Sequence, residues 1–149
     1  MKTAAELLKL KAHQTVYTTT PTASVFDALK LMAEMNVGAL LVMEGAGISG
    51  IITERDYARK VVLMSRSSKD TPVSDILSDK VICVSPDHTV EECMRLMTEN
   101  RVRHLPVVQG DKILGIVSIG DLVNWTISAQ HSTIHQLETY ITGYPTSHA

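Results

Sequence analysis

A hydroxyl and a carboxylate recur three residues apart in this chain, at Thr53 and Asp56 and again at Ser118 and Asp121. Each pair follows an apolar run typical of a strand and begins a run typical of a helix. A hydroxyl and an acid at this spacing satisfy the free N–H groups of a new helix, so a structural cap is the first interpretation. The same place also favours phosphate, because unpaired N–H groups and the helix dipole point there, and a carboxylate can accept hydrogen bonds from a ribose diol. The pairs therefore indicate either helix caps or a nucleotide site.

A glycine precedes each pair by three positions, at Gly50 and Gly115. A missing side chain at that point would let another group approach the strand closely. The full pattern, G-x-x-[TS]-x-x-D, is present twice. Its double occurrence favours a binding site over two unrelated caps.

Most of the sequence consists of two copies of one unit, related by a shift of 65 positions that aligns Pro21 with Pro86 and Asp56 with Asp121 without a gap. In each copy the apolar spacing predicts a short strand, a helix, two strands and a second helix. In the first copy these are a helix starting at Val25, strands over residues 38–44 and 47–53, and a helix over residues 53–64. A unit of this size is marginal alone, so we expect one α+β module in which two β-α-β-β-α repeats are fused with pseudo-two-fold symmetry.

The predicted boundaries divide the chain into four parts. Residues 1–65 are the first repeat with its N-terminal segment, residues 66–75 a polar linker, residues 76–128 the second repeat, and residues 129–149 a tail helix.

Composition excludes several classes of function. The 149 residues carry a net charge of only −2 with both signs interspersed, so we expect neither nucleic acid nor an anionic membrane as a partner. No apolar run approaches the roughly 20 residues of a membrane span, and the N-terminus lacks an apolar signal core, so we expect a cytoplasmic protein. Cys83 and Cys93 lack metal-site or redox spacing and are predicted to be reduced, mostly buried thiols.

The repeated unit closing on GIITERD and GIVSIGD, together with RVRHLPVV and VSDIL, resembles a tandem pair of CBS domains, a Bateman module, over about residues 16–127. The resemblance implies two clefts that bind AMP, ADP or ATP, or in some members NAD(H) or S-adenosylmethionine. It places phosphate or ribose contacts on Thr53 and Ser118 and the ribose hydroxyls on Asp56 and Asp121. The binding set implied in this way comprises Thr18, Thr20, Gly38, Ala39, Thr53, Arg55, Asp56, Cys83, Ser85, Arg103, His104, Pro106, Ser118 and Asp121.

The two copies differ where the family often places basic residues. Arg103, His104 and Pro106 occupy the strand start in the second copy, whereas the first copy has Gly38 and Ala39 there and offers Arg55 instead. We therefore expect unlike clefts, one with Arg103 and His104 suited to a monophosphate, and one with Arg55 and small residues suited to a bulkier dinucleotide.

Three functions from different classes follow. The first is a small-molecule sensor that works as a homodimer or through a separate protein effector, with no effector domain on this chain. The second is a structural dimerisation module with degenerate clefts, and the third is an enzyme acting on nucleotides, which lacks an activated nucleophile or a positioned base. Trp125 is interpreted as contacting the tail or a subunit, and the pair His131 and His135 lacks a third ligand for a metal.

Overall fold

The computed structural model describes residues 2–11, 15–77 and 81–129. Its first repeat contains β1 (Thr18–Thr19), α2 (Val25–Met35), β2 (Ala39–Glu44), β3 (Gly47–Thr53), α3 (Glu54–Tyr57) and the π-helix η1 (Ala58–Val62). The strands form one sheet in the order β1-β2-β3, with β1 parallel and β3 antiparallel to β2. The predicted helix over residues 53–64 is therefore a short α-helix that continues as a π-helix.

Local chemistry explains the boundaries of these elements. The Ser24 hydroxyl accepts a hydrogen bond from the Asp27 N–H and starts α2. Helix α2 ends at Asn36, whose φ of 55° is left-handed, a conformation that asparagine tolerates. Gly45, with φ of 59°, supplies the turn between β2 and β3.

The second repeat contains α4 (Val90–Asn100), β4 (His104–Gln109), β5 (Lys112–Ser118) and a helix that covers residues 119–129. Its first strand is reduced to a single parallel bridge between Val84 and Val107. The α+β class and the repeated order of elements are thus confirmed. The predicted tail helix lies outside the described residues from residue 130 onward, as do His131 and His135.

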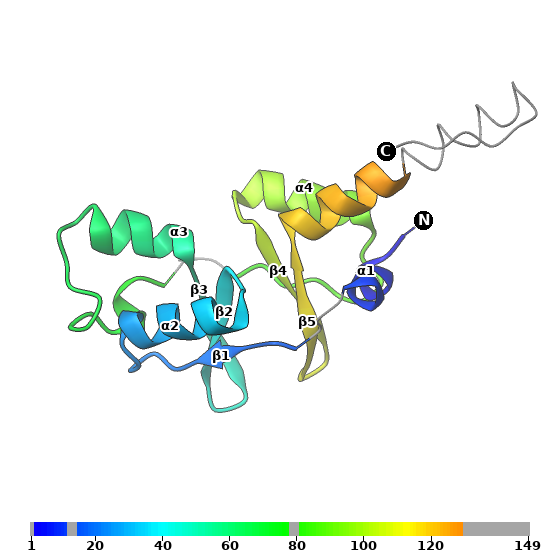
Figure 1. Ribbon diagram of the computed structural model, residues 1–149. Coiled ribbons are helices and arrows are strands. Elements are labelled where there is room, and N and C mark those ends of the chain that lie inside the picture. The colour runs from blue at the N-terminus through cyan, green and yellow to red at the C-terminus, as the bar shows by residue number, and fades with distance from the viewer. Residues whose placement is uncertain (1, 12–14, 78–80, 130–149) are drawn as a thin grey trace, which may run out of the picture.

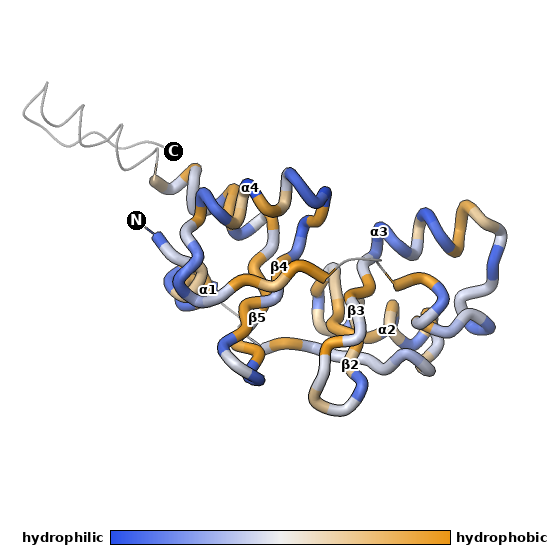
Figure 2. Tube along the Cα trace, turned by 180° about the vertical axis from the view of Figure 1, so that it is seen from behind, coloured by the Kyte–Doolittle hydropathy of each residue, from blue (hydrophilic) through white to orange (hydrophobic). Residues whose placement is uncertain are grey.

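The strands of the two repeats meet in the middle of the molecule, and α2, α3 and α4 lie on the outside (Figure 1). Ala39, Leu41 and Ile51 of the first repeat form a buried cluster with Ile113 and Ile116 of the second. The tube view shows hydrophobic strands in both halves (Figure 2). Because burial of this apolar surface is shared, the two repeats form one module.

Each repeat packs against a segment that comes just before the other repeat in the sequence. Helix α1 (Ala4–Leu10) lies beside β5 in the second-repeat half (Figure 1), and the 3-10 helix η2 (Val73–Asp75) packs on the first repeat. The Ala4 N–H donates to the His88 carbonyl at 2.8 Å, and the Val73 N–H donates to the Ala23 carbonyl at 2.8 Å. The two segments are therefore equivalent. We grouped the N-terminal segment with the first repeat, but its helix belongs to the core of the second, where Ala4, Leu7 and Leu8 are buried.

The two motif glycines allow these segments to pack closely. A Cβ on Gly115 would lie 2.7 Å from Leu8 Cδ2, and one on Gly50 would lie 3.1 Å from Leu77 Cδ1. Close approach at these positions was predicted, and the approaching groups are leucines of the chain itself.

Two further features concern the chemistry of the surface and core. Cys93 is buried and Cys83 is exposed, and both are free. The prediction of a buried thiol is wrong for Cys83, because strand alternation turns its neighbour Val84 into the core instead.

Within the described ranges, no helix has the length and apolar character needed to cross a membrane.

Candidate ligand-binding site

Both hydroxyl–acid pairs form helix caps. The Thr53 hydroxyl oxygen accepts from the Asp56 N–H at 3.1 Å, and Asp56 Oδ2 accepts from the Thr53 N–H at 3.0 Å. Ser118 and Asp121 repeat the arrangement, with Ser118 Oγ accepting from the Asp121 N–H at 3.2 Å and Asp121 Oδ2 accepting from the Ser118 N–H at 2.8 Å. The cap interpretation therefore holds in both repeats. A carboxylate has two oxygens with several acceptor sites, so a cap does not use up its capacity to accept hydrogen bonds.

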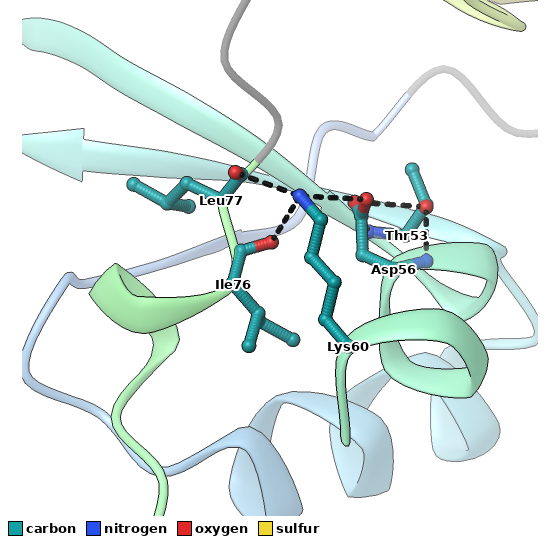
Figure 3. Close-up of polar contacts among 5 residues, drawn as sticks. All are labelled: Thr53, Asp56, Lys60, Ile76 and Leu77. Atoms are coloured by element: carbon teal, nitrogen blue, oxygen red, sulfur yellow. Dashed lines mark hydrogen bonds and ion pairs between the residues drawn. The ribbon is translucent and has the colours of Figure 1, made fainter. Parts of the chain in front are cut away.

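A lysine contacts each of the two aspartates. Figure 3 shows Lys60 between Asp56 and the segment that joins the repeats, with Nζ 3.6 Å from Asp56 Oδ1. The same ammonium donates to the carbonyls of Ile76 at 3.4 Å and Leu77 at 3.1 Å. Lys60 thus links Asp56 in α3 to the segment that joins the two repeats. The Asp56 side chain is only 12% exposed.

The second aspartate is contacted from the N-terminal segment. Lys11 Nζ lies 3.0 Å from Asp121 Oδ2 and donates to the Ile116 carbonyl at 2.7 Å. The Asp121 side chain is 21% exposed. Its other oxygen, Oδ1, takes part in none of the hydrogen bonds formed within the described ranges of the chain. One carboxylate oxygen therefore fixes the helix start and Lys11, and the other keeps its acceptor capacity.

A cavity of about 930 Å³ lies beside Asp121 and draws its wall from both repeats. Helix α1 and Lys11 form one side, and the end of α2 with the start of β2 forms another. The start of β4, the end of β5 and the helix over residues 119–129 complete it. The described residues of the wall are Leu7, Leu8, Leu10, Lys11, Thr15, Tyr17, Glu34, Met35, Asn36, Val37, Gly38, Ala39, His104, Ile116, Ser118, Asp121, Asn124, Trp125 and Ser128.

Five of the predicted site residues meet at this cavity: Gly38, Ala39, His104, Ser118 and Asp121. The first two belong to one repeat and the other three to its partner repeat. The sequence predicts separate clefts for the small residues and for His104, whereas here both line one cavity. They meet because the starts of β2 and β4 both reach this cavity between the repeats.

The other predicted residues lie away from this wall. Thr53 and Asp56 form the first cap, and Arg55 beside them is exposed. Arg103 is exposed, and its backbone carbonyl accepts from the Ile119 N–H at 2.9 Å, which fixes the helix start.

The remaining four predicted positions and Cys83 make local contacts. Thr18 pairs with Leu41 between strands, and the Thr20 hydroxyl lies 3.5 Å from that of Thr22. The Ser85 N–H donates to His88 Nδ1 at 2.9 Å, and Pro106 is buried in β4, where its carbonyl accepts from the Val84 N–H at 2.9 Å. Cys83 is exposed.

Sequence reasoning missed two residues of the wall that matter chemically. Lys11 was not singled out, because nothing in the repeated pattern placed the N-terminal segment beside the second acid. Trp125 was interpreted as a tail or subunit contact, yet it lines the cavity and packs against the core of the second repeat. The spacing of Trp125 four positions after Asp121 was the available signal, since residues four apart share a helix face.

The sequence pattern that forms this cavity is that of a known family. The family model described as "CBS domain" matches residues 6–63 and 73–128. The chain belongs to the CBS-domain family. It carries two CBS domains in tandem, which confirms the resemblance. Proteins of this family are typically regulatory, and CBS domains commonly bind adenosine ligands and oligomerise.

Solved and curated CBS proteins resemble the whole module. A putative signal-transduction protein with CBS domains from Burkholderia ambifaria is 55% identical, with a TM-score of 0.82 over 87% of this chain and 96% of that one. The mitochondrial CBS domain-containing protein CBSX3 of Arabidopsis thaliana is 45% identical over 80% of this chain, which spans 61% of the plant protein. A hexameric CBS-CP12 protein from bloom-forming cyanobacteria is 33% identical, with a TM-score of 0.72 over 81% of this chain and 70% of that one.

His104 of this CBS pair has a lowered pKa. Burial is the main cause, followed by the charge of Lys11; Asp121 acts in the opposite direction, Arg103 lowers the pKa and Asp56 raises it. The imidazole is therefore neutral at neutral pH. In the cavity it offers one N–H donor and one acceptor nitrogen rather than a positive charge.

The lowered pKa predicts a pH dependence of stability. Because the folded pKa lies below the unfolded value of about 6.5, the unfolded chain binds a proton that the folded chain does not. Stability is then lost as the pH falls through about 6.5 and levels off below the folded pKa. We expect His104→Asn to reduce the loss between pH 7.5 and 5.5 by a few tenths to about 1 kcal/mol in urea unfolding. Equal losses in the variant and the parent would contradict this role of His104.

Proposed function

We propose that this tandem CBS protein is a regulatory sensor that binds an adenine nucleotide in the cavity beside Asp121. AMP is the first candidate, with ADP, ATP and NAD(H) as alternatives. The observation that carries the proposal is the Asp121 carboxylate: Oδ2 fixes the helix cap and Lys11, and Oδ1 has no hydrogen bond within the described chain. A ribose diol supplies two hydroxyl donors, which such an oxygen can accept.

The cavity supports a ligand of this size and chemistry. Its volume of about 930 Å³ lies in the range of small-molecule sites, roughly 300 to 1,000 Å³. The wall is largely apolar, with Tyr17 and Trp125 as flat surfaces for a base and a small number of polar groups to orient it. Gly38 and Ala39 leave room at the strand start.

The signal would come from a shift between arrangements of the two repeats. Residues of both repeats line the cavity, so a ligand there contacts both at once. It favours the arrangement that it binds best, and the shift cannot exceed the difference in its affinity for the two arrangements. We propose no catalytic role, because no activated nucleophile or positioned base accompanies Asp121 and Ser118 among the described residues of this wall.

Self-association is a second part of the proposal. Ile119, Val123 and Ile127 are exposed at four-residue spacing on one helix, and Val62, Leu63 and Met64 are exposed at the end of the equivalent helix. We propose that a second copy of the chain covers these side chains in a homodimer. The cyanobacterial relative is a hexamer, so a larger assembly is an alternative.

A cytoplasmic location stays a prediction, since the plant relative is named as mitochondrial.

Thermal unfolding with AMP, ADP, ATP, NAD⁺, NADH and S-adenosylmethionine tests the proposal. A ligand at about 100 times its dissociation constant adds roughly 2.7 kcal/mol, which raises the melting temperature of a chain of this size by about 5 to 10 °C. We expect a selective rise with an adenine nucleotide, and sedimentation of the same samples shows whether the assembly changes. If no adenosine compound raises the melting temperature, the self-association module becomes the better description.

A further inference from the structure

We propose that Lys11 is the phosphate-binding residue of this cavity and that it selects a nucleoside monophosphate. The inference rests on the proposed function, because it concerns the nucleotide that binds beside Asp121. It differs from the expectation drawn from the sequence, which placed the phosphate at Arg103 and His104.

Lys11 is the one cation that the described part of the wall offers. Arg103 and Arg55 lie off that wall, and His104 is neutral at neutral pH. A phosphate that enters the cavity needs a positive partner, since burying an unpaired dianion is costly. The ammonium of Lys11 supplies that charge 3.0 Å from Asp121 Oδ2, next to the proposed ribose position. A 5′-phosphate is attached to the same ribose, so Lys11 can contact Asp121 and the phosphate at the same time.

Within the described ranges of the chain, Lys11 uses only two of its three hydrogen-bond donors. An ammonium group has three donors, and two are used by the Ile116 carbonyl at 2.7 Å and Asp121 Oδ2 at 3.0 Å. Those two contacts fix the position of Nζ before a ligand arrives, so little side-chain entropy is lost when the third donor meets a phosphate oxygen. The main chain before Lys11 is held as well, because Leu7 and Leu8 are buried in the core of the second repeat.

The charge on the wall limits the number of phosphates. Glu34 and Asp121 bring two negative charges and Lys11 one positive charge. A single phosphate group can be placed against Lys11, whereas the further phosphates of ATP would meet no second cation among the described residues of the wall. Like charges in a partly closed site repel strongly, so the cavity should favour AMP over ATP.

The test compares the affinities of adenosine, AMP and ATP by calorimetric titration. In the parent protein we expect AMP to bind at least 10-fold more tightly than adenosine and more tightly than ATP. In Lys11→Met the preference for AMP over adenosine should fall to about 3-fold or less, while adenosine affinity changes by less than about 3-fold. Lys11→Arg should keep most of the preference, since it keeps the charge. Lys9→Met is the matched control, because Lys9 is exposed in the last turn of α1, two residues before Lys11, and should leave the ratio unchanged.

The outcomes separate the two proposals. If the parent binds AMP and Lys11→Met retains the AMP-to-adenosine ratio, or if ATP binds more tightly than AMP, the Lys11 inference is overturned and the proposed function stands. If the parent binds none of adenosine, AMP, ADP, ATP and NAD(H), both are overturned. A purely structural role of Lys11 would weaken adenosine and AMP equally, and that result also overturns the inference. Lys11→Gln, which keeps a polar side chain, provides the same comparison if Lys11→Met does not fold.

Discussion

Truncating Leu8 to alanine should destabilise the protein by about 2 to 5 kcal/mol, as much as truncating a leucine inside either repeat. Leu8 is only 6% exposed, although it precedes both repeats in the sequence. Its side chain packs over Gly115 and joins the core that contains Leu105 and Leu122. Removing the three carbon atoms beyond Cβ there leaves a cavity that a small domain cannot easily close.

The matched control for this prediction is two residues away. Leu10 lies on the same helix but is 64% exposed, so Leu10→Ala should change the free energy of unfolding by less than about 0.5 kcal/mol. Urea unfolding followed by circular dichroism measures both variants. Similar small effects of the two truncations would show that α1 is not part of the core of the second repeat.

Replacing Asp121 by asparagine should weaken AMP binding by about 10- to 100-fold. Hydrogen bonds to a charged group are worth about 1.5 to 3 kcal/mol, and the amide offers one acceptor oxygen where the carboxylate has two. Asparagine can keep the helix cap through that oxygen, but its NH₂ group would meet the ribose hydroxyls or the Lys11 ammonium. Calorimetric titration gives the change in affinity, and thermal unfolding shows whether the fold is retained.

Asp56→Asn is the control, because it makes the same chemical change in the equivalent cap. Asp56 lies off the described wall of the cavity and contacts Lys60, which in turn binds the carbonyls of Ile76 and Leu77 (Figure 3). We expect AMP affinity within about 3-fold of the parent and a loss of about 1 to 3 kcal/mol in stability. An equal loss of AMP affinity in both variants would contradict the assignment of the nucleotide to the Asp121 side.

Local patterns in the sequence predicted local structure well. The hydroxyl and the acid three residues apart predicted caps at Thr53 and Ser118, and both caps are present. Glycines at positions 50 and 115 predicted close approach, which the leucines of the chain make. Such features depend on neighbours within one turn or on a missing Cβ, so they can be found without knowing the fold.

Contacts between the two repeats could not be predicted from such local patterns. Gly38 and His104 meet at one cavity because the two sheets pack face to face, which no local spacing encodes. The repeated pattern also did not reveal that α1 and the segment at η2 occupy equivalent positions in the two repeats. Ala4 matches Val73 at a shift of 69 positions rather than 65, so the ungapped alignment that revealed the repeats stops before it reaches α1.

The crystal structure of the protein grown with AMP tests the central claim most directly. The account predicts one nucleotide in the cavity between the repeats, with the ribose hydroxyls within hydrogen-bond distance of Asp121 Oδ1 and the phosphate against Lys11. Density for AMP beside Asp56 and Arg55, with the cavity at Asp121 empty, would contradict it.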